Sequence, residues 1–512
     1  MPLSPRTPRA LVPLLVVLAL AAATAQDLTP PSWRTMIADT GLPGIDRGVR
    51  DNDAPRPPRT SAVLIADRSL PFMRGSLIVK FKAGTTATAQ RAMVDRIHGT
   101  MTQALPYSDF TIVNIDSTTD PEAAAQQLAA QPDVEYAQAR YRLHPFFKPN
   151  DPLYTRQWNY PAIDMERAWD INPGPTPQVT VAVIDSGVAY RSGLVRFNAH
   201  AFRVENGPSF PALGLIDVPF AAAPDLAGAD RFVSPRDFIW NDTDPLDLDG
   251  HGTHVSGTIG QLTNNGVGVA GMAFNVRIMP VKVIDTDWDF IFGSPNQGTD
   301  DVVARGVRYA VDNGAKVLNM SIGRTGPPAP VIQDAITYAV SQGAFVSIAA
   351  GNDFLDGNPI ERPADVAPQI EGAVAVGAVG RDLARARYSS TGSYVELAAP
   401  GGDTSRGGTE AAILQQTYDL DFVETFLDGP SGYRAPRFDV FAYEFFQGTS
   451  MAAPHVSGFA ALLMQQGITS PAAIEAIMKR YATDLGSAGR DNEYGYGLIN
   501  PRASLRGMGL AK

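Results

Sequence analysis

Three side chains of different chemistry stand in short, well-marked motifs of this sequence. Asp185 ends the apolar stretch "VAVID", His251 is the first histidine of "HGTH", and Ser450 lies within "GTSMAAPHVSG". A serine hydroxyl becomes a strong nucleophile when a base takes its proton, and an imidazole oriented by a carboxylate can do so near neutral pH. If the fold brings these residues together, they can perform acyl transfer.

Asn352 is a fourth residue that acyl transfer can use. It follows the apolar stretch "VSIAAG", and a side-chain amide together with a backbone N–H can hold the oxyanion that develops in acyl transfer. Ser450 also has a second interpretation. Thr449 and Ser450 precede an apolar run of helical period, and Ser and Thr oxygens often cap the start of a helix.

The stretches around these residues predict the elements that must position them. Short segments rich in β-branched residues are expected as strands buried on both faces, and amphipathic segments that end in glycine as helices. Strands are predicted at 178–185, 277–285, 315–323, 344–352 and 373–380, and helices at 299–314 and 330–343. This alternation predicts an α/β fold with a mostly parallel, doubly wound sheet covered by helices. Ligands of such sheets bind beyond the carboxyl ends of the strands.

An earlier part of the chain predicts a separate, smaller unit. Strands are expected at 76–82, 110–115 and 134–143, and helices at 86–99 and 120–131. The second helix should begin on Asp120-Pro121, because proline suits the first helical position. Together these elements predict a small α+β domain.

Four motifs carry a resemblance to a known family. In chain order, "VAVIDSGV", "DGHGTHVSGTI", "AAGN" and "GTSMAAPHVSG" resemble the subtilisin-like serine proteases, or subtilases. The order Asp, His, Ser is that of subtilisin. The resemblance implies a catalytic domain over 149–512 with the activity of a serine endopeptidase. Insertions near 190–235 and 402–444, rich in Pro, Gly and Asp, are predicted to be irregular and at the surface.

The resemblance implies a role for each of the four residues named first. Asp185 would orient the imidazole, His251 would act as general base and then as acid, and Ser450 would be the nucleophile. Asn352 and the Ser450 backbone N–H would form the oxyanion hole. The chemistry implies no cofactor for catalysis, and the expected partners are protein or peptide substrates.

A further segment is implied to bind the substrate. Ser321, Ile322 and Gly323 match the strand that pairs with the substrate backbone in this family and lines the first specificity pocket. Family members often continue with a second glycine, where this chain has Arg324. The preference of the pocket is therefore left open.

Two stretches suggest structural calcium. Asp237, Asp242, Asp244, Asp247 and Asp249 precede the motif with His251, and hard oxygen ligands bind Ca²⁺. The stretch "LTNNGVGVAG" resembles a calcium loop of the family, which implies the carbonyls of Leu262, Val267 and Val269, the side chain of Asn265, and Asp151 as ligands. A solvated acidic loop is the alternative. The remaining histidines of these motifs, His254 and His455, are predicted to be structural.

The N-terminus predicts export. Arg6 and Arg9 precede a short apolar run that ends in small residues at 23–25, the pattern of a cleaved signal peptide over 1–25. A Pro-rich leader is predicted at 26–70. The α+β unit, 71–148, would then be an inhibitory propeptide cut away around 144–150, and an independent binding domain is the alternative. The mature protein is expected to be extracellular or periplasmic, monomeric and without a membrane segment.

Composition limits the other possibilities. The 512 residues carry a formal charge of -11 and no cysteine, which argues against nucleic acid as a partner and excludes disulfides and thiolate zinc sites. An α/β-hydrolase esterase would need a Gly-x-Ser-x-Gly motif with His last in the chain, whereas here Ser450 comes last. A non-catalytic binding protein on a protease fold is a further alternative.

Overall fold

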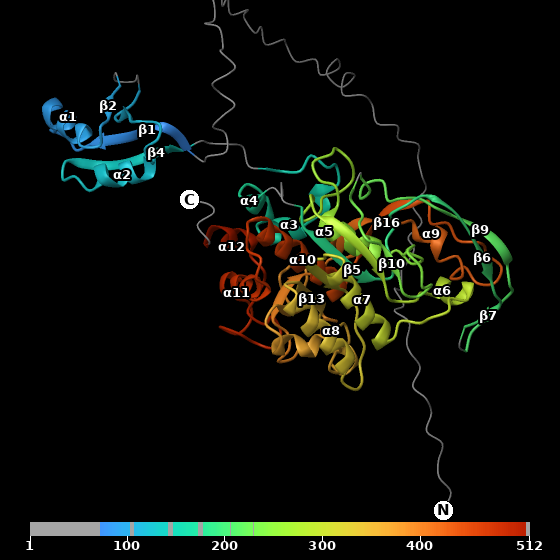
Figure 1. Ribbon diagram of the computed structural model, residues 1–512. Coiled ribbons are helices and arrows are strands. Elements are labelled where there is room, and N and C mark those ends of the chain that lie inside the picture. The colour runs from blue at the N-terminus through green and yellow to red at the C-terminus, as the bar shows by residue number, and fades with distance from the viewer. Residues whose placement is uncertain are drawn as a thin grey trace, which may run out of the picture. The chain divides into compact units, whose positions relative to one another are not determined.

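We describe the protein from a computed structural model, which covers residues 72–102, 107–141, 147–172, 178–204, 206–228 and 230–507. The chain divides into two compact units, one ending at Leu143 and the other beginning at His144. Each unit is described by itself (Figure 1). The predicted signal peptide (1–25) and leader (26–70) lie outside the described residues.

The N-terminal unit is a four-stranded antiparallel sheet with two helices. Its elements are β1 (Phe72–Phe81), α1 (Ala87–Asp95), β2 (Thr100–Met101), β3 (Thr111–Asn114), α2 (Pro121–Ala129) and β4 (Val134–Tyr141), and the strand order is β2-β3-β1-β4. Asp120 caps α2 by accepting the Glu122 N–H at 3.0 Å, and Pro121 occupies the first helical position. The predicted α+β fold is confirmed, and only the short β2 is not indicated by the sequence pattern.

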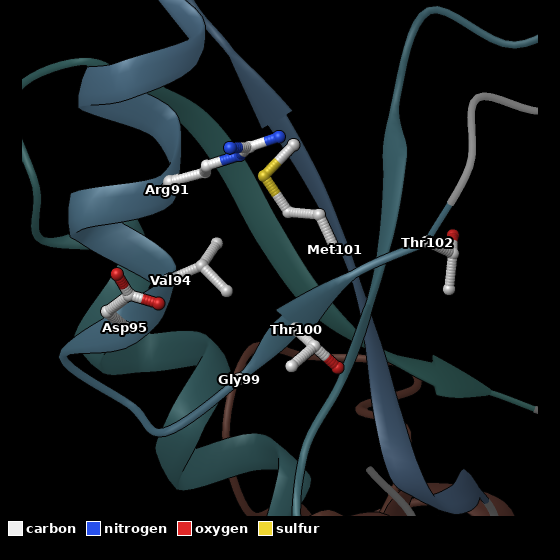
Figure 2. Close-up of a pocket in the computed structure, with 7 residues that line it drawn as sticks. All are labelled: Arg91, Val94, Asp95, Gly99, Thr100, Met101 and Thr102. Atoms are coloured by element: carbon white, nitrogen blue, oxygen red, sulfur yellow. The ribbon is translucent and has the colours of Figure 1, made fainter.

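This unit has a cavity of about 440 Å³ between α1 and β2, and Figure 2 shows the residues that line it. It is lined by Arg91, Val94, Asp95, Gly99, Thr100, Met101 and Thr102. A Cβ atom on Gly99 would lie 2.6 Å from Val113 of β3, so the close approach of the turn to the sheet requires glycine. Because none of the predicted site residues lines this cavity, it is not the candidate site.

The C-terminal unit is built on a parallel sheet whose seven strands lie in the order β10-β11-β5-β12-β13-β14-β15 in the described part of the chain. These strands are β5 (Thr180–Asp185), β10 (Arg236–Asp237), β11 (Arg277–Lys282), β12 (Val317–Met320), β13 (Phe345–Ala349), β14 (Ala373–Val379) and β15 (Leu397–Pro400). Each of the five strands predicted for this unit is present, and the predicted doubly wound α/β fold is confirmed.

Helices cover both faces of this sheet (Figure 1). They are α3 (Asn159–Ala162), α4 (Met165–Trp169), α5 (His251–Gly260), α6 (Asp287–Phe292), α7 (Asp300–Asp312), α8 (Pro330–Ser341), α9 (Leu420–Val423), α10 (Thr449–Gln465), α11 (Pro471–Tyr481) and α12 (Pro501–Gly507). Short 3-10 helices lie at Tyr154–Arg156, Phe354–Asp356, Ala364–Gln369, Thr404–Arg406 and Thr409–Ala411. None of the helices in the described ranges is long and apolar enough to cross a membrane.

Alternate residues of β5 belong to two separate cores. Val181 and Val183 pack in the core that contains α5 and α10, whereas Ala182 and Ile184 pack in the core that contains α7 and α8. This period of two is that of a strand buried on both faces. The same alternation places the side chain of Asp185, the last residue of β5, on the face covered by α5 and α10.

The two stretches predicted to be irregular contain paired strands, so that part of the prediction is wrong. The first holds β6 (Gly193–Ala199), β7 (Phe202–Arg203), β8 (Ser209–Phe210) and β9 (Gly214–Phe220), in which β6 pairs with β9 and β7 with β8. The second leads into the pair β16 (Ile413–Tyr418) and β17 (Phe441–Phe446).

β16 shows why the sequence was misleading there. All six of its residues are buried, although three are polar. Gln415 donates from Nε2 to the Ala270 carbonyl at 3.1 Å, and Thr417 donates from its hydroxyl to the Gly250 carbonyl at 2.6 Å. A buried polar side chain with a hydrogen-bond partner costs little, but its polarity hides the strand from a hydrophobicity pattern.

Candidate active site

Asp185 lies at the carboxyl end of β5, on the face covered by α5 and α10. Its side chain is fully buried. Oδ1 accepts hydrogen bonds from Nδ1 of His251 at 2.7 Å and from the Ser186 N–H at 2.8 Å. Because Nδ1 of His251 donates to the carboxylate, Nε2 is the ring nitrogen that can take a proton from another group.

His251 is the first residue of α5 and remains partly exposed, with 28% of its side chain accessible. Burial alone would lower the pKa of its imidazole. The negative charge of Asp185, with smaller contributions from Asp249 and Asp247, outweighs burial and raises the pKa of His251 from 6.5 to about 9. The carboxylate therefore strongly stabilises the protonated ring that forms when the histidine takes a proton.

Ser450 is the second residue of α10, and hydrogen bonds from the end of strand β12 fix its position. Pro454 has no N–H, so the Ser450 carbonyl has no donor four residues later in the helix. The Ser321 hydroxyl donates to this carbonyl at 2.8 Å instead. Behind it, Asn319 donates from Nδ2 to Ser321 Oγ at 2.9 Å, and Ser457 donates to Asn319 Oδ1 at 2.8 Å. This buried chain of hydrogen bonds ties the start of α10 to the end of β12.

The hydroxyl of Ser450 does not have the partner that we expect from the resemblance. It donates to the Ser321 carbonyl at 3.2 Å rather than to His251. Ser321 follows the last residue of β12, where the carbonyl extends beyond the strand ladder and is free to accept. A change of one side-chain torsion of Ser450 redirects this hydroxyl without moving the backbone.

Asn352 and the backbone of Ser450 present two N–H groups to the same small space. The Thr449 N–H donates to Asn352 Oδ1 at 2.9 Å, and this orients the amide so that Nδ2 faces away from Thr449. A Cβ atom on Gly448 would lie 3.5 Å from the Ser450 nitrogen and 3.7 Å from Asn352 Nδ2. Neither donor bonds to any group in the described ranges, so the absent side chain of Gly448 leaves room for an oxyanion.

The segment predicted to bind the substrate lies next to these groups. Ser321 is buried because of its bonds to α10, Ile322 is half-buried and Gly323 is exposed. The backbone groups of Ile322 and Gly323 bond to none of the residues that the structure describes. An exposed and unpaired strand end of this kind can pair with an extended peptide.

The loop predicted to bind calcium is closed by Asp151. The Asp151 carboxylate is buried and accepts the Asn264 N–H at 2.8 Å and the Asn265 N–H at 3.3 Å. Asn265 Oδ1 accepts the Val267 N–H at 2.8 Å. Asp151 and Asn265 thus lie together, as predicted, and Val267 is in contact with Asn265.

A second carboxylate, not indicated by the sequence pattern, enters the same loop. Asp225 accepts Asn265 Nδ2 at 2.8 Å and the Val269 N–H at 3.2 Å, and its carbonyl accepts the Leu262 N–H at 3.0 Å. Burial raises the pKa of Asp225 to about 6, against weaker opposing hydrogen bonds. In this structure both carboxylates accept N–H groups of the loop, and Asn265 turns its Nδ2 rather than its oxygen toward Asp225.

The acidic stretch before His251 does not gather around one point. Its carboxylates Asp237, Asp242, Asp244, Asp247 and Asp249 have separate partners; Asp244 pairs with Arg191, and Asp247 accepts the Thr253 hydroxyl at 2.6 Å. The described ranges contain no group of three or more His, Cys, Asp or Glu side chains that could hold a metal ion. The calcium interpretation of this stretch therefore has no geometric support.

His254 and His455 are structural, as predicted. Nε2 of His254 lies 3.1 Å from the Glu444 carbonyl, and burial lowers the pKa of this ring to about 3. His455 bonds through Nδ1 to the Met451 carbonyl at 2.8 Å and through Nε2 to Asn159 at 2.9 Å, and burial lowers its pKa to about 4. Both rings are neutral and have fixed partners, so neither is available as a base.

Comparison with models of known protein families shows to which family this chain belongs. Residues 176–497 match the model of the subtilase family, and residues 58–139 match that of the fervidolysin N-terminal prodomain. The chain belongs to the subtilase family. It is a subtilisin-like serine protease that carries an N-terminal prodomain, as in a zymogen.

Curated relatives of this subtilase span most of its length. A thermophilic serine proteinase of Bacillus sp. (strain AK1) is 30% identical over 88% of this chain and 92% of its own. An extracellular protease of Xanthomonas campestris is 28% identical over 84% of this chain and 72% of its own. Thermitase of Thermoactinomyces vulgaris is 31% identical over 67% of this chain and 94% of its own.

Solved structures agree on the fold of the subtilase. A protease from Pseudoalteromonas arctica has a TM-score of 0.53 and 29% identity, covering 70% of this chain and 99% of the other. Fervidolysin from Fervidobacterium pennivorans has a TM-score of 0.51 and 24% identity, covering 85% of this chain and 61% of the other. The second of these comparisons supports the fold alone.

Proposed function

We propose that this subtilase is a secreted endopeptidase that hydrolyses peptide bonds through an acyl-enzyme formed on Ser450, with His251 and Asp185 as the other members of a triad. The observation that carries the proposal is the Asp185–His251 hydrogen bond of 2.7 Å at the carboxyl edge of the sheet. The same edge holds Ser450 and two unpaired N–H donors. Catalysis uses only groups of the protein itself and takes no cofactor.

In the first half of the reaction, Nε2 of His251 takes the proton of the Ser450 hydroxyl as Oγ attacks the carbonyl carbon of the scissile bond. The carbonyl oxygen becomes an oxyanion and accepts hydrogen bonds from the Ser450 N–H and Asn352 Nδ2. His251 then gives its proton to the amine of the leaving peptide. The C–N bond breaks and the acyl group stays on Ser450.

In the second half, a water molecule replaces the amine. His251 takes one proton from the water, and the remaining hydroxide attacks the acyl carbon. The same two N–H donors hold the second oxyanion. When this intermediate collapses, the bond to Oγ breaks, His251 returns the proton to Ser450, and the free carboxylic product leaves.

A serine-directed fluorophosphonate probe tests the proposal directly. We expect covalent labelling of the mature protein at a single peptide that contains Ser450. Absence of labelling would instead favour a binding protein on a protease fold.

Asn352→Ala should lower kcat by about 10²–10³ and change KM little, because the amide contacts the substrate oxygen mainly when it carries charge. Steady-state kinetics on a peptide anilide measure both constants. Asn313→Ala is the matched control, since Asn313 is exposed at the end of α7. A large rise in KM with unchanged kcat would contradict this role.

The pH dependence follows from the raised pKa of His251. Only the neutral ring can act as base, so kcat/KM should rise with pH and reach its plateau only above an apparent pKa between 6.5 and about 9. The effect on folding has the opposite sign. Because the pKa of His251 is higher in the folded protein than in the unfolded chain, the protonated ring stabilises the folded state fully below pH 6.5. This contribution to the free energy of unfolding is lost as the pH rises through about 9. A plateau in kcat/KM already reached at pH 6 would contradict the proposed pairing with Asp185.

The N-terminal segments are proposed to direct export and processing. Residues 1–25 act as the signal peptide, and the prodomain within 71–148 inhibits the catalytic domain, 149–512, until the enzyme cuts the chain around residues 144–150. Relatives named as extracellular proteases support secretion. The mature enzyme is proposed to be a monomer that acts on protein or peptide substrates outside the cytoplasm, either extracellularly or in a periplasm.

The loop that holds Asn265 is proposed to bind one structural calcium ion. The ligands would be the Asp151 and Asp225 carboxylates, the Asn265 side chain, and the carbonyls of Leu262, Val267 and Val269. Bound calcium would offset the cost of burying the Asp225 carboxylate and stabilise a protein that has no disulfides.

Chelation should lower the melting temperature of the mature protein by several degrees, because the folded state alone binds the ion. The Ser450→Ala variant avoids self-digestion in this measurement, which compares EDTA-treated and calcium-loaded samples. Asp225→Asn should lose most of the calcium-dependent shift, whereas Asp242→Asn, at an exposed position, should keep it. An equal melting temperature in the two samples would refute the site.

A further inference from the structure

We propose that Glu361 and Asp353 give this protease a preference for Lys or Arg immediately before the scissile bond. The inference rests on the proposed function, in which Ser321–Gly323 binds the substrate backbone. It concerns two acidic residues to which the sequence pattern gave no role.

The Glu361 carboxyl lies between two backbone segments of the site. A Cβ atom on Gly351 would be 2.0 Å from Glu361 Cγ and 2.8 Å from Oε1, and a Cβ atom on Gly323 would be 3.6 Å from Oε2. Gly351 directly precedes Asn352, and Gly323 ends the proposed substrate-binding segment. A substrate side chain that enters between these glycines therefore meets the Glu361 carboxyl.

The backbone fixes this placement. Arg324 and Arg362 form a two-way bridge, with N–H to carbonyl distances of 2.9 Å and 2.8 Å. Glu361 immediately precedes Arg362, so the bridge holds its backbone beside the segment that ends at Gly323. Its side chain is almost fully buried, with 4% of the residue exposed.

In the part of the chain that the structure describes, the Glu361 carboxyl forms no ion pair with a cation. The carboxyl of Asp353, which directly follows Asn352, interacts with it. The two neighbouring arginines are engaged elsewhere: Arg324 donates to Asp300 at 2.8 Å, and Arg362 pairs with Asp365. Tyr394 donates its hydroxyl to the Ala350 carbonyl at 3.2 Å rather than to the carboxyl.

A buried carboxyl without a cation, beside a second, half-buried acid, is costly. Burial, with a smaller contribution from Asp353, raises the pKa of Glu361 to about 8. Most natural carboxylates this deeply buried are paired. An ammonium or guanidinium group of the substrate would supply the missing charge and permit Glu361 to ionise.

Peptide anilides that differ only in the residue before the scissile bond test the preference. We expect kcat/KM for Arg and Lys to exceed that for Gln, Met and Phe by at least about tenfold, since opposite charges in a partly buried site attract strongly. Glu361→Gln should reduce the Arg-to-Gln ratio by about tenfold or more, and Asp353→Asn by a smaller factor. Activity on the Gln and Met peptides should remain.

Glu371→Gln is the matched control, because Glu371 is exposed and lies just before β14, at the opposite end of the parallel strands. It should leave every ratio unchanged. A second measurement uses benzamidine, a small cation, whose inhibition constant should rise in Glu361→Gln. This inhibitor would detect the charge even if the variant cleaves all peptides slowly.

The outcomes separate this inference from the proposed function. A wild-type enzyme that prefers Phe or Met, with ratios that Glu361→Gln does not change, would overturn the inference alone. A protein that cleaves no peptide and takes no fluorophosphonate would overturn the proposed function itself. A preference for Gln would show that a protonated Glu361 carboxyl binds a neutral amide, which also contradicts the inference.

Discussion

Ser450→Ala should reduce kcat by about 10⁶ and leave the prodomain attached to the catalytic domain. The first effect follows because no other group at this position can form an acyl-enzyme, and loss of the serine alone costs about as much as loss of the whole triad. The second follows if the enzyme cuts its own chain. Peptide kinetics and mass spectrometry of the secreted product measure the two effects.

The matched control is Ser487→Ala, because Ser487 is exposed on the C-terminal unit. It should be processed and active like the wild type. A Ser450→Ala protein that still appears with an N-terminus near residues 144–150 would show that another protease makes the cut. A wild-type product that still begins near Gln26 would refute the zymogen proposal.

Asp185→Asn should lower kcat by about 10⁴ at neutral pH. The amide can donate a hydrogen bond to Nδ1 of His251 and would then favour the tautomer with the proton on Nε2, which cannot accept the Ser450 proton. The Asp185→Asn substitution also removes the negative charge that contributes most to raising the pKa of His251. The pH profile of the residual kcat/KM should therefore shift to lower pH.

Asp244→Asn serves as the control for this variant. Asp244 precedes His251 in the same loop but pairs with Arg191 instead of the imidazole. Its replacement should leave kcat within about threefold of the wild type. If Asp185→Asn retained near-normal kcat with an unchanged pH profile, the carboxylate would not orient the base, and the proposed triad would fail.

The sequence was sufficient to predict the parallel sheet, because strands buried on both faces have a simple composition. It also placed Asp185 correctly at the end of β5 and Asn352 shortly after β13. The start of α10 at Thr449 was equally predictable from its apolar period.

What the sequence could not supply depends on contacts between distant segments. Asp225 lies 40 residues before Asn265, to which it bonds, and nothing near it in the sequence marks it as a ligand. Glu361 likewise becomes notable only when folding places its carboxyl against Gly351. The polar strand β16 was missed because the groups that accept from Gln415 Nε2 and the Thr417 hydroxyl are remote in sequence.

The position of α10 in the chain also determines when the enzyme can become active during its synthesis. This helix covers the centre of the sheet, with almost every residue buried, yet it follows all seven strands of that sheet in the chain. Until the ribosome has released that part of the chain, Val181, Val183 and Phe345 lack one of the helices that complete their core. The same late segment carries Ser450. A growing chain therefore lacks the proposed nucleophile while this core is incomplete, and it cannot digest itself before α10 has been made.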